Sequence, residues 1–164
     1  PGGNPNSEKI RKLILNNNSN FNKDTDLLLY MAARSENMSI IKRSFNKKII
    51  LIDRFTDSTI AYQHYGMGVD LNLIETLNKY LLKDIRVSFT FLNIVNQKNL
   101  QKRLKQRQSL NRYDKFKMSF YNKVQKGFLD LSKKQKNKYQ LINSNLDINN
   151  NEKLILDKID RLIK

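Results

Sequence analysis

The sequence has no cysteine among its 164 residues, which excludes disulfide bonds and thiolate metal ligands. It also has no apolar run that approaches the roughly 18 residues of a membrane-spanning helix. The opening segment, PGGNPNSEKI, lacks the apolar stretch of a secretory signal peptide. These absences favour a cytoplasmic protein that does not bind membranes.

Acidic residues are scarce as well: 15 Asp and Glu stand against 31 Lys and Arg, and the formal net charge is +16. A charge of this size makes nucleic-acid binding one hypothesis. The Lys residues, however, are scattered over predicted helix faces and turns, and AT-rich codons explain the high content of both Lys and Asn. We therefore favour an enzyme of anionic substrates without a specific nucleic-acid partner, and keep a basic nucleic-acid-binding protein as the alternative.

Hydrophobic residues make up 39% of the sequence, a normal globular share, and we predict a single domain over residues 1–164. Short apolar runs rich in β-branched residues predict buried strands at 49–54, 87–94 and 139–144. Helical periodicity predicts helices at 7–15, 24–45, 58–65, 71–82, 97–107, 116–134 and 152–163. Ser7 and Thr25 are expected to cap the first two helices. Strands that alternate with helices indicate an α/β fold with a parallel sheet.

A polar cluster follows directly after the apolar run at 49–52. Ligands bind at the carboxyl ends of parallel strands, so this cluster is expected to form a site. Arg54, next to Asp53, is suited to a bidentate contact with a phosphate. The hydroxyl and amide groups of the following helix can converge on a small polar ligand; they belong to Ser58, Thr59, Tyr62 and Gln63.

Tyr30 and Arg34 are four residues apart and therefore share one helix face. An aromatic ring beside a guanidinium can stack on a pyrimidine and bind its carbonyl edge. The spacing alone also fits a simpler interpretation, in which Tyr30 is an ordinary core residue. Similarly, Arg103 and Arg107 by themselves could form a solvated helix face.

Five segments resemble motifs of the thymidylate kinase family, in the family's order and over nearly the whole chain. DRFTDSTIAYQHYGMG is similar to its Asp-Arg-aromatic-x-x-Ser-x-x-Ala-Tyr-Gln signature with a following Gly-x-Gly, and PGGNPNSEKIRKLIL to its Pro-Gly-Gly segment. LLLYMAARSEN resembles its Leu-Leu-aromatic-x-Ala-x-Arg helix. RLKQRQSLNRYD resembles its lid, expected at about 103–114, and KVQKGFLDLSKK the helix after it.

The resemblance implies ATP-dependent phosphorylation of dTMP to dTDP in dTTP biosynthesis, with ATP and Mg²⁺ as cofactors and a homodimer as a possible assembly. Tyr30 would stack on the thymine and Arg34 would reach its O4. Arg54 would hold the acceptor phosphate and would be catalytic together with Asp53 and Arg107. Further dTMP contacts are implied for Ser58, Thr59, Tyr62 and Gln63. Contacts of the lid with the ATP phosphates are implied for Arg103, Arg107 and Arg112.

The sequence also departs from the family pattern. It contains no Gly-x-x-x-x-Gly-Lys-Ser/Thr, which the family carries before its Pro-Gly-Gly segment. We therefore expect a three-layer P-loop kinase-like fold without its central strand, first helix and one edge strand, and an inactive fragment whose three strands form no continuous sheet. Asn93, Asn111 and Asn143 stand where the family has Asp. Codon drift is one explanation, and a non-catalytic remnant of a kinase gene is the other.

Overall fold

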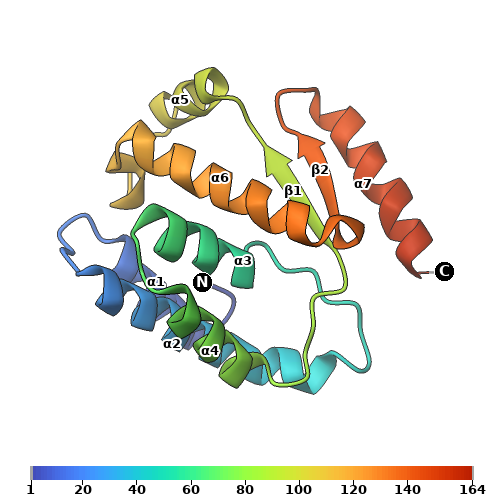
Figure 1. Cartoon of the computed structure of the whole chain (residues 1–164), viewed down its shortest axis with the longest axis horizontal. Helices are drawn as coiled ribbons and strands as arrows, with labels where there is room; N and C mark the ends of the chain where they lie inside the picture. The colour runs from blue at the N-terminus through green and yellow to red at the C-terminus, as the bar shows by residue number, and fades with distance from the viewer. Residues whose placement is uncertain (1, 164) are drawn as a thin grey trace. The chain divides into compact units, whose positions relative to one another are not determined.

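The structure, a computed structural model, describes residues 2–163 (Figure 1). They form two compact units. The first, called the helical unit, contains residues 2–86 and 110–131, and the second, called the sheet unit, contains residues 87–109 and 132–163. Helices combined with a parallel sheet confirm the predicted α/β class. The single domain over 1–164 stays a prediction.

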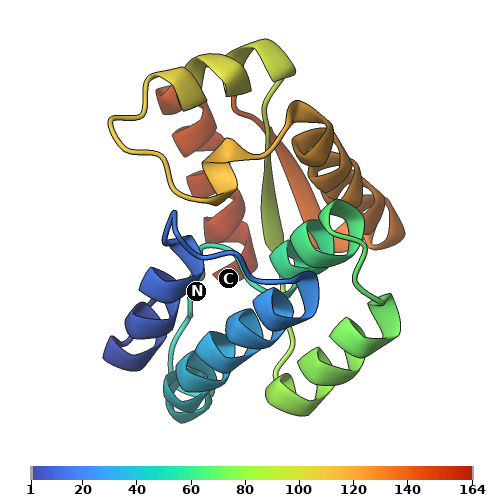
Figure 2. The same cartoon turned by 90° about the vertical axis from the view of Figure 1, so that its left-hand side faces the viewer.

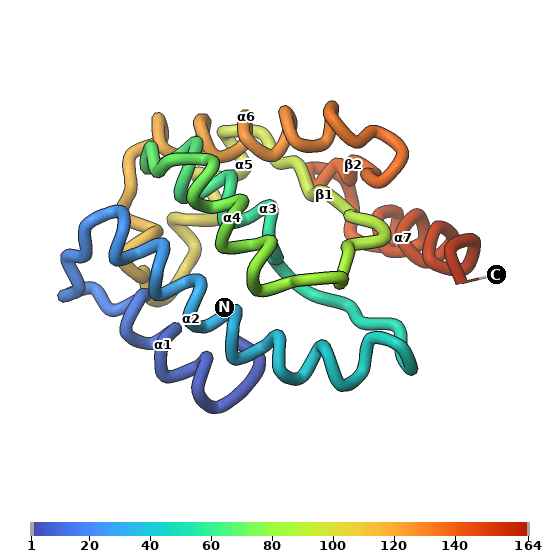
Figure 3. The backbone as a smooth tube through the Cα atoms, turned by 60° about the horizontal axis from the view of Figure 1, so that its bottom comes forward, coloured from blue at the N-terminus to red at the C-terminus, as the bar shows by residue number. Residues whose placement is uncertain are grey.

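The helical unit is built around two long helices. α1 (Pro5–Leu15) lies beside α2 (Lys23–Ser44), as the backbone trace shows (Figure 3). α3 (Thr56–Thr59) continues directly into the π-helix η1 (Ile60–Gly66), and α4 (Leu71–Leu82) follows. The 3₁₀ turn η2 (Tyr113–Lys115) and most of α6 (Met118–Lys134) complete the unit. Its hydrophobic core contains Leu27, Met31, Val69 and Ile74.

The helix caps differ from the prediction. Asn4, and not Ser7, is the N-cap of α1, because Pro5 has no N–H and suits the first helical position. Ser7 is instead the third residue of a capping box: its N–H donates to Asn4 Oδ1 at 2.9 Å, and its Oγ accepts from the Asn4 N–H at 3.1 Å. Asn22, and not Thr25, caps α2, and it accepts from the backbone N–H of Thr25 at 2.8 Å.

The prediction of a strand at 49–54 is wrong. This segment has no regular structure, and it pairs with no strand of the described chain. Ile49 is 64% and Leu51 78% exposed, although both were expected to be buried. An apolar run becomes a strand only where a neighbour pairs its N–H and C=O groups. The expectation that the three segments form no continuous sheet is therefore confirmed.

The sheet unit contains the other two predicted strands, with shorter bounds. β1 (Thr90–Ile94) and β2 (Tyr139–Asn143) pair in parallel and lie side by side in Figure 2, with Leu92 opposite Leu141. Leu92 and Ile142 are buried. The unit also contains the helices α5 (Gln97–Lys105) and α7 (Ile148–Ile163) and the 3₁₀ turn η3 (Lys136–Lys138).

Candidate functional site

Arg34 lies on α2, one turn after Tyr30, and its side chain joins α2 to the start of α3. Its Nη2 donates to the carbonyl oxygen of Phe55 at 3.0 Å and to Thr59 Oγ1 at 2.6 Å. The guanidinium carbon also lies 4.9 Å from the centroid of the Phe55 ring. The structure thus brings together two of the residues that the sequence predicted for the site, Arg34 and Thr59.

The rest of the Arg34 guanidinium is buried without a partner. The residue is 8% exposed, and its Nε and Nη1 have no hydrogen-bond partner among residues 2–163. Burial lowers the pKa of Arg34 to about 10, although the charge of Asp57 acts in the opposite direction. The side chain is still a cation at neutral pH. Each unpaired buried donor costs roughly 1–3 kcal/mol, so two in one side chain indicate a place for an acceptor from outside the protein.

Arg54 adopts a backbone conformation that is unusual for its residue type. Its φ angle is 62°, in the left-handed region that costs a non-glycine residue about 1–2 kcal/mol. The guanidinium carbon lies 5.2 Å from the centroid of the Tyr62 ring, and the residue is otherwise exposed. A strained residue that presents an exposed cation is typical of a functional position.

Tyr113 connects several of the predicted ligand-binding residues. It is 6% exposed, and its hydroxyl donates to the carboxylate of Asp26 and accepts from Gln63 Nε2 at 3.3 Å. Its ring makes edge-on contacts with Tyr30 and with Tyr62, each at a centroid distance of 6.0 Å. Burial first, and then the proximity of Tyr30 and Asp26, raise the pKa of Tyr113, so the hydroxyl keeps its proton.

Arg112 contacts protein groups and not open solvent. Its guanidinium forms an ion pair with Asp26, which is only 1% exposed, and it lies 5.5 Å from the centroid of the Phe21 ring. The side chain of Arg112 is 12% exposed. This arrangement belongs to the helical unit, and the predicted contact of Arg112 with the ATP phosphates stays a prediction.

Arg103 and Arg107 belong to the sheet unit, and both are exposed. Arg103 Nη2 donates to the carbonyl oxygen of Ser144 at 2.6 Å, just after the end of β2. The structure therefore groups Tyr30, Arg34, Arg54, Thr59, Tyr62 and Gln63 in the helical unit, separately from these two lid residues. Asp53 is exposed and Ser58 is half-buried in the helical unit.

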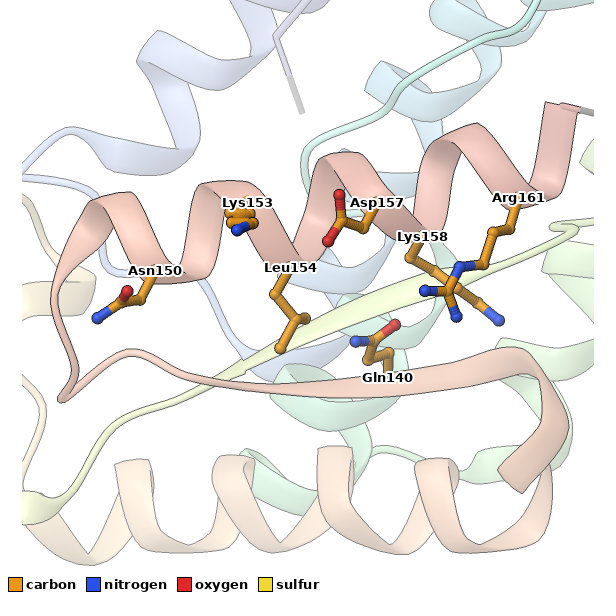
Figure 4. A pocket seen from close by; sticks show the side chains of 7 residues that line it. All are labelled: Gln140, Asn150, Lys153, Leu154, Asp157, Lys158 and Arg161. Atoms are coloured by element: carbon orange, nitrogen blue, oxygen red, sulfur yellow. The ribbon is translucent and has the colours of Figure 1, made fainter.

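A groove of about 290 Å³ lies between β2 and α7 in the sheet unit (Figure 4). Three of its side chains are cationic, namely Lys153, Lys158 and Arg161, and one, Asp157, is acidic. The Lys158 ammonium lies 4.8 Å from the centroid of the Phe89 ring. None of the predicted substrate residues lines this groove.

Comparison with known protein families matches residues 1–155 to thymidylate kinase. This chain belongs to the thymidylate kinase family. The thymidylate kinase of Wolbachia pipientis subsp. Culex pipiens (strain wPip) is 34% identical over 154 residues, which cover 93% of this chain and 72% of that protein. The thymidylate kinase of Ehrlichia ruminantium (strain Gardel) is 38% identical over 155 residues, with 92% and 72% covered.

The fold agrees with this family. The crystal structure of thymidylate kinase from Ehrlichia chaffeensis matches with a TM-score of 0.74 and 34% identity, over 100% of this chain and 78% of that one. The predicted P-loop kinase-like α/β class is therefore confirmed, and the chain is placed in a family of phosphotransferases. No helix within residues 2–163 is long and apolar enough to cross a membrane.

Two residues that contact the candidate site of this thymidylate kinase family member were not predicted from the sequence, Asp26 and Tyr113. Asp26 precedes Tyr30 and Arg34 by one and two turns of α2, so the spacing 26, 30, 34 places all three on one face. That spacing is the signal that could have identified Asp26. Tyr113 has no such local signal, since the two residues that its hydroxyl bonds, Gln63 and Asp26, lie 50 and 87 residues away in the chain.

Proposed function

We propose that this chain supplies the dTMP site of an enzyme that transfers a phosphoryl group from ATP to dTMP and forms dTDP. The observation that carries the proposal is the buried Arg34 guanidinium, which has two hydrogen-bond donors without a partner in the described chain. A pyrimidine carbonyl oxygen is a suitable acceptor, because it is neutral and can be buried with the base. The O4 of thymine is such an oxygen.

The neighbouring side chains support a pyrimidine nucleotide. Tyr30 is half-buried one turn before Arg34, where its ring can stack on the base. Thr59 already accepts a hydrogen bond from Arg34, which aligns the guanidinium with the base edge. Tyr62 and Gln63, held through Tyr113, are assigned to the sugar side. Ser58 is assigned to the same ligand.

The reaction needs positioning and charge compensation more than covalent chemistry. An oxygen of the dTMP phosphate forms a bond to the γ-phosphorus of ATP, and the bond from that phosphorus to the β,γ-bridging oxygen breaks, so that ADP leaves. Arg54 is assigned to the acceptor phosphate, whose charge it balances and whose oxygen it aligns. Asp53, Arg103 and Arg107 are assigned to the phosphate side of the transfer.

The family uses ATP together with Mg²⁺. Residues 2–163 contain no group of three or more His, Cys, Asp or Glu side chains that could hold a metal ion. Mg²⁺ is usually held by one or two carboxylates together with substrate phosphates and waters, and we assign no step to the ion. The homodimer and the cytoplasmic location stay predictions from the sequence.

Calorimetric titration of the 164-residue chain with dTMP, thymidine and dAMP tests the proposal. We expect saturable binding of dTMP and no binding of dAMP, whose base has an amino donor where thymine offers the O4 acceptor to the unpaired donors of Arg34. Thymidine lacks the phosphate that Arg54 holds, so its affinity should be roughly ten- to a hundredfold lower. Absence of dTMP binding, or equal affinity for dAMP, would overturn the proposed function.

A further inference from the structure

A buried polar cluster lies behind the proposed dTMP site and consists of Asp26, Arg112 and Tyr113. The Asp26 carboxylate accepts hydrogen bonds from the Arg112 guanidinium and the Tyr113 hydroxyl. Asp26 is 1% exposed, so it is closed off from ligand and solvent alike. Its role must therefore be exerted through the residues that it contacts.

Tyr113 is the member of this cluster that reaches the proposed site. Its hydroxyl accepts from Gln63 Nε2, and its ring makes T-shaped contacts with the rings of Tyr30 and Tyr62. Tyr30 is assigned to the base, and the other two to the sugar, so one phenol contacts three residues on the nucleoside side of the ligand. Arg54, on the phosphate side, lies over the ring of Tyr62.

The directions of the hydrogen bonds in the cluster determine how the Gln63 amide is oriented. The Tyr113 hydroxyl has one proton, which the Asp26 carboxylate takes because it can only accept. The hydroxyl oxygen is then available as an acceptor, and this fixes the Gln63 amide with its nitrogen toward Tyr113 and its carbonyl oxygen on the opposite side. Arg112 balances the buried charge of Asp26, which would be costly without a partner.

We propose that Tyr113, oriented by the Asp26–Arg112 ion pair, is a positioning residue that holds Tyr30, Tyr62 and Gln63 in the geometry that binds the nucleoside part of dTMP. The inference rests on the proposed function. It assigns Arg112, which lies within the predicted lid at 103–114, to support of the nucleoside side and not to contact with the ATP phosphates.

The variant Tyr113→Phe tests the proposal, because it keeps the ring and removes only the hydroxyl. We expect the dissociation constants of dTMP and of thymidine to rise by the same factor, about three- to tenfold, as the loss of one buried hydrogen-bond network implies. The affinity for inorganic phosphate, measured by competition against dTMP, should not change. If Tyr113 were only a structural residue, the variant would unfold at a lower midpoint, but its affinities for thymidine and for phosphate would not change by different factors.

Tyr65→Phe is the matched control. Tyr65 is on the same π-helix η1 as Tyr62 and Gln63, and its hydroxyl also bonds a carboxylate, that of Asp130. This variant should leave the affinities for dTMP, thymidine and phosphate unchanged. An equal loss in both variants would overturn the proposal.

A second pair of variants tests whether Asp26 acts through Tyr113. Asp26→Leu combined with Arg112→Met removes both buried charges together, which avoids an unpaired ion. We expect this double variant to lose the same factor in dTMP affinity as Tyr113→Phe, and the triple variant to lose no more. If the triple variant instead lost the product of the two separate factors in dTMP affinity, Asp26 and Arg112 would not act through Tyr113.

The outcomes separate this inference from the proposed function. If the wild-type chain does not bind dTMP, the proposed function fails and the inference fails with it. If the wild type binds dTMP, and Tyr113→Phe binds dTMP and thymidine equally well, only the inference fails. Because Tyr113→Phe removes a single atom, it also gives a result if the double variant does not fold.

Discussion

Replacement of Arg34 by Met is expected to reduce dTMP affinity strongly and to change stability little. Burial lowers the pKa of Arg34 from 12.5 to about 10. A difference of about 2.5 units, at about 1.36 kcal/mol per unit, corresponds to roughly 3 kcal/mol against the charged form in the folded state. The residue is 8% exposed, so solvent screening reduces this value little.

The same replacement removes two favourable contacts, the hydrogen bonds from Arg34 to the Phe55 carbonyl and to Thr59 Oγ1. Hydrogen bonds from a charged donor contribute about 1.5–3 kcal/mol each, so their loss offsets the relief of the buried charge. Together these figures leave a net loss between about 0 and 3 kcal/mol, so we expect the free energy of unfolding to fall by no more than about 3 kcal/mol in Arg34→Met. The dTMP dissociation constant should rise by roughly ten- to a hundredfold, because the base loses its charged donors.

Arg112→Met is the comparison variant. Arg112 is also buried, but it is paired with Asp26, and its removal leaves that carboxylate buried and uncompensated. This variant should lose about 3–5 kcal/mol. Urea unfolding without ligand and calorimetric titration with dTMP give the two quantities for both variants.

Two results would refute this reasoning. A loss of stability in Arg34→Met as large as that in Arg112→Met would show that Arg34 is held by protein contacts alone and is a structural residue. A dTMP affinity within twofold of the wild type would show that the unpaired donors of Arg34 do not meet the ligand.

Three further predictions concern other parts of the chain. Arg54→Ala should weaken dTMP binding roughly ten- to a hundredfold in calorimetry, and Arg54→Gly should weaken it equally but be about 1 kcal/mol more stable to urea than the Ala variant, since glycine tolerates the φ of 62°; equal stabilities would argue against strain there. Binding to duplex DNA should be weak and absent near physiological salt, and saturable DNA binding at that salt without dTMP binding would favour the nucleic-acid alternative. Gly127→Ala should lose about 1–3 kcal/mol in thermal unfolding, because its Cβ would come within 2.7 Å of the Tyr65 ring; an unchanged midpoint would mean that the ring moves freely.

Much of the secondary structure could be predicted from local sequence. The two paired strands and the long helices were found within a few residues, since apolar periodicity depends on which faces are buried. The caps were less predictable: asparagine, serine and threonine compete for the same role, and Asn4 and Asn22 hold it here. The segment 49–54 was misjudged because strand formation depends on a partner strand, which a local pattern does not contain.

The sequence by itself determined the family and the residue types of the site, since the motifs carry Tyr30, Arg34, Arg54 and their neighbours in a recognisable order. Only the tertiary structure decided how they are arranged. It leaves two donors of Arg34 without a partner, gives Arg54 its left-handed backbone, and pairs Arg112 with Asp26, which is 86 residues away in the chain. The physical reason is that burial and charge pairing are properties of the packed chain. Whether an arginine is buried, and which groups it binds, depends on segments that are distant in the sequence.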